Sequence, residues 1–575
     1  MRDRHMLAGG GAVAVFILLV CAYVLVMPYW APGRLTDLAL QSMGRGFAAA
    51  GGGHLEFGPL AIRIDDAVLS GPEGSADSFV KAGAVIVPVT FGQLLSRQPD
   101  FSTITLRDAE IALLIDERGD ASWDMHVPAT GAAMKITLER AALRYFDARN
   151  NQALALGHVE GLLEIRPDGS MSFNGSAVIA GELVRASADL RSLARVNTDG
   201  SPLDLALTAP SGTLTFSGRL ATSKALSLAG PLSLAGPDLA GLLSLTAGPA
   251  AAAMPSATAF SLEGALDSAG RAFAIRKAVL MLGGFGAAGD LAVDLRGERP
   301  RLQANLAAAS LPVDQLVPAS GAGPLDWGRR SIPFALLRMA DADITLRAET
   351  ARYGSLTTAA TQLNATLADG RLSVSGDTRL ATGGGLGVAV GLDAAALPPQ
   401  ASVSLRADET GAQPLLAALT GVTQLAGAGG FSAELTASGT TQEEMVGTLA
   451  GTARLALRDG SITGSDLPAL MVAATTPVTG WTAGAGATPF KTLSGEVALA
   501  DGIATIRQLT IATGSTVLGI SGTGDLLRRA VDVTVVASPE SGAAPTAAVG
   551  IRGKWDAPAI GPAPAPAGSL PATGN

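Results

Sequence analysis

Apolar residues alternate with Ser, Thr or charged residues along many short segments of this chain. This period of two is typical of a β-strand with one buried face. Clear examples are Ile104 and Leu106, Leu214 and Phe216, Ile344 and Leu346, Leu372 and Val374, Val403 and Leu405, and Leu455 and Leu457. The pattern predicts a mainly β chain, and the lack of a strand–helix–strand rhythm argues against a parallel α/β sheet.

Turn signals separate these segments. Asp-Gly pairs are favoured in two-residue type I′ hairpins, because both central residues need φ > 0. Such pairs recur at Asp168-Gly169, Asp369-Gly370, Asp459-Gly460 and Asp501-Gly502. We therefore expect antiparallel units of strand, tight turn and strand.

A few segments carry other signals. Residues 226–255 are close to low complexity, which predicts a weak pair of strands followed by a Pro/Gly/Ala linker. Three segments predict helices: residues 32–50 with Leu35, Leu38, Met43 and Phe47 at helical spacing, a short helix at Leu94 and Leu95, and residues 332–341 with Pro333 in the first turn.

An uncharged run from Met6 to Met27 determines the expected compartment. Its 22 residues would form about 33 Å of helix, enough to span a hydrocarbon core of about 30 Å. Two arginines precede the run and Tyr29-Trp30 follow it, which predicts a single-pass anchor with a cytoplasmic N-terminus and an exported bulk. The competing interpretation is a cleaved signal peptide, whose apolar core is usually only about 7–15 residues long.

The composition excludes several classes of function. At 48% hydrophobic residues, the 575-residue chain can bury a core, which excludes wholesale disorder. A net charge of −9 argues against nucleic-acid binding, which requires a basic face. The single Cys, which lies in the predicted membrane span, excludes a disulfide framework and a cysteine-based metal site.

Motifs for catalysis are missing. Gly284 to Gly289 fits G-x-G-x-x-G, but the segment that follows alternates as a strand, so a tight turn or bulge is favoured over a dinucleotide site. The four His residues are scattered, no G-x-S-x-G or H-E-x-x-H occurs, and Glu443-Glu444 reads as a solvated helix start. We expect no enzyme activity, no catalytic residues, no metal and no cofactor.

Two regions resemble the AsmA family of bacterial inner-membrane-anchored periplasmic proteins. In residues 1–125 the order of span, helix, strand, small helix and strand fits, with Gly119 and Trp123 at the final corner and Ser122 in place of the family's Asn. In residues 325–560 the C-terminal signature of the family is matched by Leu449, Gly451, Asp459, Gly460, Ile462, Gly464, Asp466 and Leu467.

The resemblance implies a role in outer-membrane biogenesis. The family is related to chorein-type bridge-like lipid-transfer proteins, in which a long, curved antiparallel sheet forms an apolar groove for phospholipid acyl chains. The implied partners are the inner membrane, phospholipid and outer-membrane or periplasmic proteins. Candidate groove-lining residues are Ile104, Leu106, Leu214, Phe216, Ile344, Leu346, Leu372, Val374, Val403, Leu405, Leu455 and Leu457, and the signature turn comprises Asp459, Gly460, Gly464 and Asp466.

The expected organisation follows from these signals. It comprises a cytoplasmic N-terminus (1–5), a transmembrane helix (6–28), an α+β region (29–125), a β-rich middle (126–324), a C-terminal β region (325–560) and a disordered tail (561–575).

Several alternatives stay open. The residues alone allow the apolar strand faces to line an open groove or the core of a closed sandwich. The closed form would suit a non-enzymatic scaffold or regulator of outer-membrane protein assembly. A surface adhesin or β-helical stalk would show a fixed short repeat, and an exported enzyme would need a catalytic constellation, and the sequence shows neither.

Overall fold

The computed structural model divides the chain into two compact units, residues 1–283 (unit 1) and 284–575 (unit 2), which are described separately. The anchor predicted at residues 6–28, Trp123 and most of the predicted tail lie outside the described residues. Among those that are described, no helix is long and apolar enough to cross a membrane. The described residues are 46–71, 78–96, 100–122, 133–149, 152–179, 181–242, 258–316, 328–329, 331–354, 356–381, 383–420, 422–464, 466–467, 486–542, 545–555 and 557–563.

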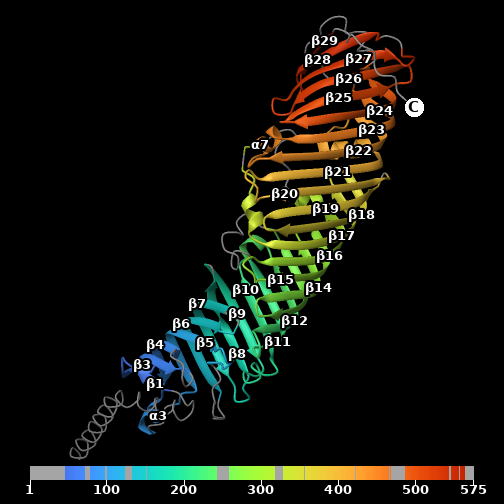
Figure 1. Ribbon diagram of the computed structural model, residues 1–575. Helices are drawn as coiled ribbons and strands as arrows, with labels where there is room; N and C mark the ends of the chain where they lie inside the picture. Colours follow the sequence, from blue (N-terminus) through green and yellow to red (C-terminus); the bar gives the residue numbers. More distant parts are fainter. Residues whose placement is uncertain are drawn as a thin grey trace, which may run out of the picture. The chain divides into compact units, whose positions relative to one another are not determined.

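Unit 1 is a β-sheet, drawn in blue to green in Figure 1. A short helix, α3 (Phe91–Ser96), follows β4 at the position predicted from Leu94 and Leu95. The strands are β1 (Phe47–Ala49), β2 (Gly53–Glu56), β3 (Ala61–Ser70), β4 (Ser78–Pro88), β5 (Thr103–Ile115), β6 (Met134–Asp147), β7 (Gln152–Ile165), β8 (Met171–Ile179), β9 (Glu182–Leu190), β10 (Ser201–Ala209), β11 (Gly212–Ala221), β12 (Ser227–Gly236), β13 (Phe260–Ala269) and β14 (Ala272–Leu282).

Unit 2 is also mainly sheet, with helices between some strands. The helices are α5 (Val313–Leu316), the 3₁₀ helix η3 (Phe334–Arg338), α6 (Ala412–Thr420) and α7 (Gln442–Gly447). The strands are β15 (Phe285–Asp294), β16 (Arg301–Pro312), β17 (Asp341–Tyr353), β18 (Leu356–Ala368), β19 (Arg371–Leu380), β20 (Gly385–Asp393), β21 (Gln400–Gly411), β22 (Leu425–Ser438), β23 (Ala450–Thr463), β24 (Ala487–Ala500), β25 (Ile503–Ala512), β26 (Thr516–Asp525), β27 (Ala530–Pro539), β28 (Ala547–Lys554) and β29 (Ala557–Pro562).

Within each unit, strands that follow one another pair with one another, except that β1 and β2 both pair with β3, and nearly all pairs are antiparallel as predicted. The sequence reading missed one parallel step in each unit. Strand β5 runs parallel to β6, and β16 runs parallel to β17. In both places the chain returns through a long connection, residues 116–133 and 313–340, because a parallel partner cannot be reached by a tight turn.

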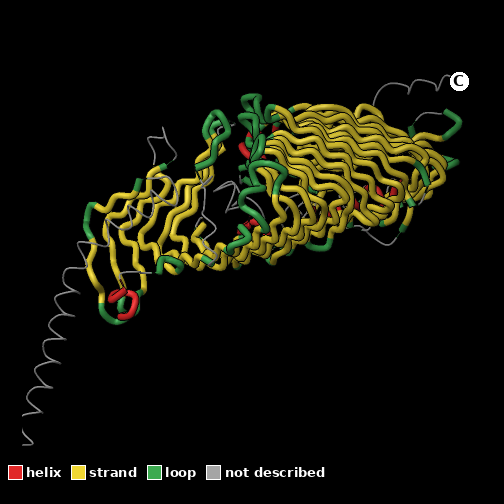
Figure 2. The backbone as a smooth tube through the Cα atoms, turned by 90° about the horizontal axis from the view of Figure 1, so that it is seen from below, coloured by secondary structure: helices red, strands yellow, loops and turns green. Residues whose placement is uncertain are grey.

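Many strands bend in the middle at β-bulges. Arg140 and His158, inside β6 and β7, have φ near +50° at points where the pairing register shifts, which marks a bulge; Asp66 and Asp108 have the same φ inside β3 and β5 without a shift. A bulge inserts an unpaired residue, bends its strand and increases the local twist. Figure 2 shows the strands of each unit as bent tubes rather than straight ones.

The bulges also correct one turn prediction. Asp369-Gly370 and Asp501-Gly502 form two-residue hairpins with φ > 0 at both residues, as predicted. The Asp168-Gly169 turn is present between β7 and β8, but of this pair only Gly169 has positive φ. The hairpin predicted at Asp459-Gly460 is wrong: the pair lies inside β23, where Asp459 (φ 49°) occupies a bulge opposite β22.

Two further predictions change. Phe47 to Ala49 form β1 rather than the end of a helix, because they pair with β3 and tertiary pairing outweighs helical spacing. Residues 227–236 form one strand, not two, because β12 pairs along its length with β13. Its pairing with β11 breaks around Gly230-Pro231, where proline has no N–H to donate.

Three more local predictions fall on described residues and are confirmed, although the helix predicted at 332–341 is shorter and has Pro333 at its N-cap instead of in its first turn. Residues 334–338 form η3, and Glu443-Glu444 lie in the first turn of α7, whose N-terminus is capped by the Thr441 side chain. The residues after Gly284 form β15, so the glycine motif does not precede a helix.

Candidate apolar binding face

Each unit carries one continuous apolar face, which the strand register makes visible. Residues paired across neighbouring strands point to the same side of a sheet, so a row of paired residues can be followed from strand to strand. In unit 2 one such row contains only apolar residues and glycines: Leu291, Ala304, Ile344, Ala365, Val374, Val390, Val403, Leu435, Gly451, Leu499, Ala504, Gly524, Val531, Gly553 and Pro558.

Unit 1 has a row of the same kind. It comprises Gly53, Ile64, Val85, Leu106, Leu138, Gly161, Gly175, Ala186, Leu207, Leu214, Leu234, Leu262 and Leu280. We call the side of each sheet that carries these rows the apolar face, and the opposite side the polar face.

The polar face carries charged side chains that pair across neighbouring strands. Examples are Arg107–Glu139 at 2.7 Å and Arg140–Asp108 at 2.7 Å in unit 1, and Arg371–Asp393 at 3.0 Å, Arg454–Glu496 at 2.9 Å and Arg552–Asp532 at 2.9 Å in unit 2. The hydrogen bond from Arg140 lowers the pKa of Asp108, and that from Arg454 lowers the pKa of Glu496. Because these ion pairs are exposed, the polar face is the side of the sheet that contacts water.

All twelve candidate groove residues lie on the apolar face, either in the two rows or an even number of residues from a row member. Leu106, Phe216 and Leu457 are buried, at 8%, 3% and 5% exposure. Val403 is 38% exposed, and the other eight are half-buried. The alternation in the sequence therefore predicted that these side chains share one face of the sheet, although their exposure varies; that this face binds lipid stays a prediction.

Helix α6 covers part of the apolar face in unit 2. Its Leu415 is 1% exposed and packs in one cluster with Leu386 and Ala407. Its Leu416 belongs to a second cluster with Leu457 and Leu493. The positions that α6 covers lie near the C-terminal end of β21, after which the helix begins. The row through Val403 lies near the opposite end of this strand, and its members there are only partly buried.

The signature residues have structural roles that the sequence did not reveal. A Cβ atom on Gly460 would overlap both the Phe490 ring and the Ala426 carbonyl oxygen. Gly460 and Phe490 are paired across β23 and β24. Because Gly460 has no side chain, it leaves room for the Phe490 ring, which is only 4% exposed. Gly464 has φ +83° and donates its N–H to the Gly486 carbonyl at 2.8 Å. Asp466 lies next to that glycine.

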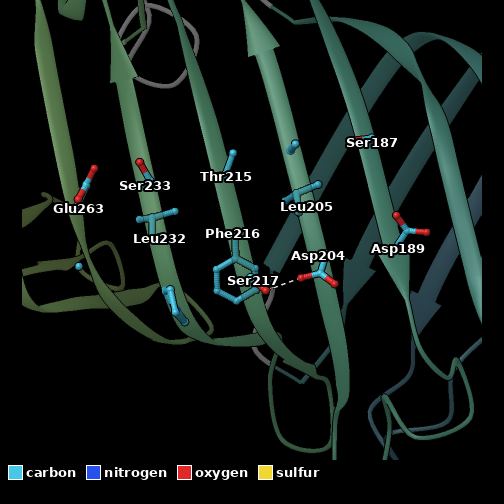
Figure 3. Close-up of a pocket in the computed structure, with 13 residues that line it drawn as sticks. Ser187, Asp189, Asp204, Leu205, Thr215, Phe216, Ser217, Leu232, Ser233 and Glu263 are labelled. Carbon is cyan, nitrogen blue, oxygen red and sulfur yellow. Dashed lines mark hydrogen bonds between the residues drawn. The ribbon is translucent and has the colours of Figure 1, made fainter.

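The polar face of unit 1 carries a hollow of about 590 Å³ (Figure 3). Its polar lining includes Asp189, Asp204, Thr215, Ser217 and Glu263, and the Ser217 hydroxyl donates a hydrogen bond to Asp204. No histidine or lysine lines it, so the only ionisable groups beside its hydroxyls are carboxylates. The described part of the chain holds no cluster of three or more metal-ligating side chains.

Comparison with known proteins identifies one family. The model of the AsmA family matches residues 322–509, which confirms the resemblance over the C-terminal region from its start to residue 509. No curated protein and no solved structure matches the chain. The AsmA family is generally membrane-associated, and this match fits a periplasmic role related to the outer membrane.

Proposed function

Because residues 322–509 identify the chain as an AsmA-family protein, we propose that it supports outer-membrane biogenesis by shielding and transferring phospholipids along its apolar faces. The observation that carries the proposal is the row of apolar residues and glycines that crosses unit 2 from β15 to β29 without a charge. A row of the same character crosses unit 1.

The physical basis is the hydrophobic effect. Each acyl CH₂ group kept from water stabilises the bound state by about 0.8 kcal/mol. Leucine, valine, alanine and glycine make no specific contact with one lipid, so neighbouring positions along a row hold a chain about equally well. The binding free energy of a lipid therefore changes little from one strand to the next, and the lipid can move along the face while its headgroup stays in water. The direction of movement would have to come from elsewhere.

The exposure pattern favours an open face over a closed sandwich core. Val403 lies in the middle of the unit 2 row and is 38% exposed, whereas core residues of a sandwich are buried. Its row neighbours Val390 and Leu435 are half-buried. The same proposal places the protein at the bacterial inner membrane, with a single N-terminal span and its bulk in the periplasm.

The test is a charge placed on the apolar face. Leu346→Asp puts a carboxylate on the lipid path of the full-length protein, and Thr345→Asp puts the same group one residue away on the polar face. We expect Leu346→Asp to reduce phospholipid transfer between donor and acceptor vesicles by about tenfold or more, because a carboxylate in an apolar site is strongly unfavourable. The Thr345→Asp variant should transfer at the wild-type rate.

Melting followed by circular dichroism shows whether each variant is folded. Val403→Asp repeats the test at a position whose exposure makes the charge easier to accommodate. Equal transfer by both Asp variants of β17 would overturn the proposal and would favour a scaffold in outer-membrane protein assembly. Absence of transfer by the wild-type protein would overturn it as well.

A further inference from the structure

The two edges of the unit 1 sheet that carry the turns, here called its rims, meet at one place. The turn between β6 and β7 lies on the first rim, which it shares with the turns β8–β9 and β10–β11. The loop between β11 and β12 lies on the second rim, with the turns β7–β8 and β9–β10. Four strands, β7 to β10, separate β6 from β11, yet the β6–β7 turn contacts the β11–β12 loop.

The polar part of this contact is made by Arg149. Its Nη1 donates to the Ser223 carbonyl at 3.0 Å, and its Nη2 donates to the Thr222 carbonyl at 2.8 Å. The same guanidinium pairs with both carboxylate oxygens of Asp147, at 2.9 and 2.8 Å. Asp147 is fully buried and the Arg149 side chain is 17% exposed, so water is largely excluded from the contact.

The apolar part involves the apolar face itself. Leu226, on the second rim, packs against Ile115, Ala121 and Tyr145 on the first. Tyr145 lies in β6 on the apolar face and is 7% exposed. Its pKa is raised to about 12, mainly by burial and further by Asp147, so the phenol is neutral at physiological pH. The second rim therefore covers the apolar face where the two rims meet.

The loop of the second rim is anchored rather than loose. The N–H of Thr222 donates to the Val196 carbonyl at 2.9 Å, and the Thr222 hydroxyl donates to Asn197. Val196 is 3% exposed and lies in the neighbouring β9–β10 loop. Two adjacent loops of the second rim thus act together, and separation of the rims would break the contact at Arg149 first.

We propose that Asp147, Arg149, Thr222, Ser223 and Leu226 form a clasp, a gate that closes over the apolar face of unit 1 and must open for a lipid headgroup to pass. The inference rests on the proposed function. A headgroup stays in water while its acyl chains lie on the apolar face. Where the rims touch, acyl chains can pass beneath the contact but the headgroup is stopped.

The chemistry of the clasp suits reversible opening. Arg149 is two residues from Asp147, so this charge pair belongs to one turn and persists when the rims separate. Among the polar groups, only the two carbonyl groups of the second rim lose their partner, and water can replace it, while the one apolar contact that breaks is that of Leu226. Opening therefore leaves no unpaired buried charge, which would cost far more.

The test is a reversible lock across the rims in the full-length protein with Cys21→Ser. Ala148→Cys and Lys224→Cys place thiols next to Arg149 and next to Ser223. A bifunctional thiol reagent with a cleavable disulfide spacer should link them in the resting protein, before any lipid is added. Failure of this cross-link would show that the rims do not meet, and would overturn the clasp without bearing on lipid transfer.

The lock should slow phospholipid transfer between vesicles by about tenfold or more, as closed gates do, and reduction of the spacer should restore it. The control pair, Thr198→Cys with Lys224→Cys, joins two loops of the same rim and should leave transfer unchanged. Full transfer by the locked protein, with an active control, would overturn the gate alone. Loss of transfer in every protein, wild type included, would instead overturn the proposed function.

Discussion

The two units present the same kind of apolar face but cover it differently at the rims. In unit 1 the cover is the clasp, in which one guanidinium reaches two carbonyl groups of the opposite rim. In unit 2 it is helix α6, which inserts Leu415 and Leu416 into apolar clusters. The polar contact of the clasp can exchange with water, and its opening exposes the packing of one leucine, Leu226, whereas α6 cannot leave without exposing two leucines from apolar clusters. In both units the sheet supplies the apolar surface, and the elements at the rims determine how much of it is open.

A core substitution in α6 tests whether this helix is a fixed part of unit 2. Leu415→Ala removes a side chain that is 1% exposed, so we expect a loss of about 2–5 kcal/mol in the free energy of unfolding of unit 2. Chemical denaturation of the full-length protein, with hydrogen exchange to assign the loss to residues 284–575, measures it.

Gln413→Ala is the matched control on the same helix. Its side chain is exposed and donates to the Thr423 carbonyl at 2.9 Å, so the change should cost only about 1 kcal/mol. If Leu415→Ala also cost less than about 1 kcal/mol, α6 would be loosely attached, and the contrast with the clasp would disappear.

A smaller effect tests a packing device that both units share. Gly460 in unit 2 lies under the Phe490 ring, and Gly218 in unit 1 lies under the Phe216 ring. We expect Gly460→Ala and Gly218→Ala each to lower the free energy of unfolding by about 1–3 kcal/mol, because the added methyl group overlaps the ring and a backbone carbonyl.

Gly385→Ala provides the reference for these substitutions, since a Cβ there meets nothing within 4 Å. It should be neutral or stabilise by about 0.4–1 kcal/mol. If all three alanine substitutions changed the free energy of unfolding equally, the glycines would not be needed to leave room for the aromatic rings.

Much of the fold and of the candidate face could be predicted from the sequence. The alternation at Leu372 and Val374, or at Val403 and Leu405, is a local property of a strand, and it placed these side chains on the apolar face. No further information is needed to predict a row without charges. Once each strand alternates, the pairing of antiparallel neighbours aligns the apolar residues of one strand with those of the next.

The missing parts depend on contacts between distant residues. The local sequence of Asp459-Gly460 suits a tight turn equally well, and only the pairing of β23 with its neighbours turns it into a bulge. The parallel step from β5 to β6 depends on a long connection rather than on a turn motif. Arg149 and Thr222 are 73 residues apart, and only the curvature of the sheet brings them together.

The central claim, that the apolar face carries phospholipid, can be tested most directly at adjacent residues of β21. Val403 lies on the apolar face at 38% exposure, and Ser402 is exposed on the polar face. A photoreactive benzoylphenylalanine is placed at either position of the full-length protein in living cells, and the adducts are identified by mass spectrometry. The account predicts phospholipid adducts at 403 and none at 402. Equal lipid labelling at both positions, or none at 403, would contradict it.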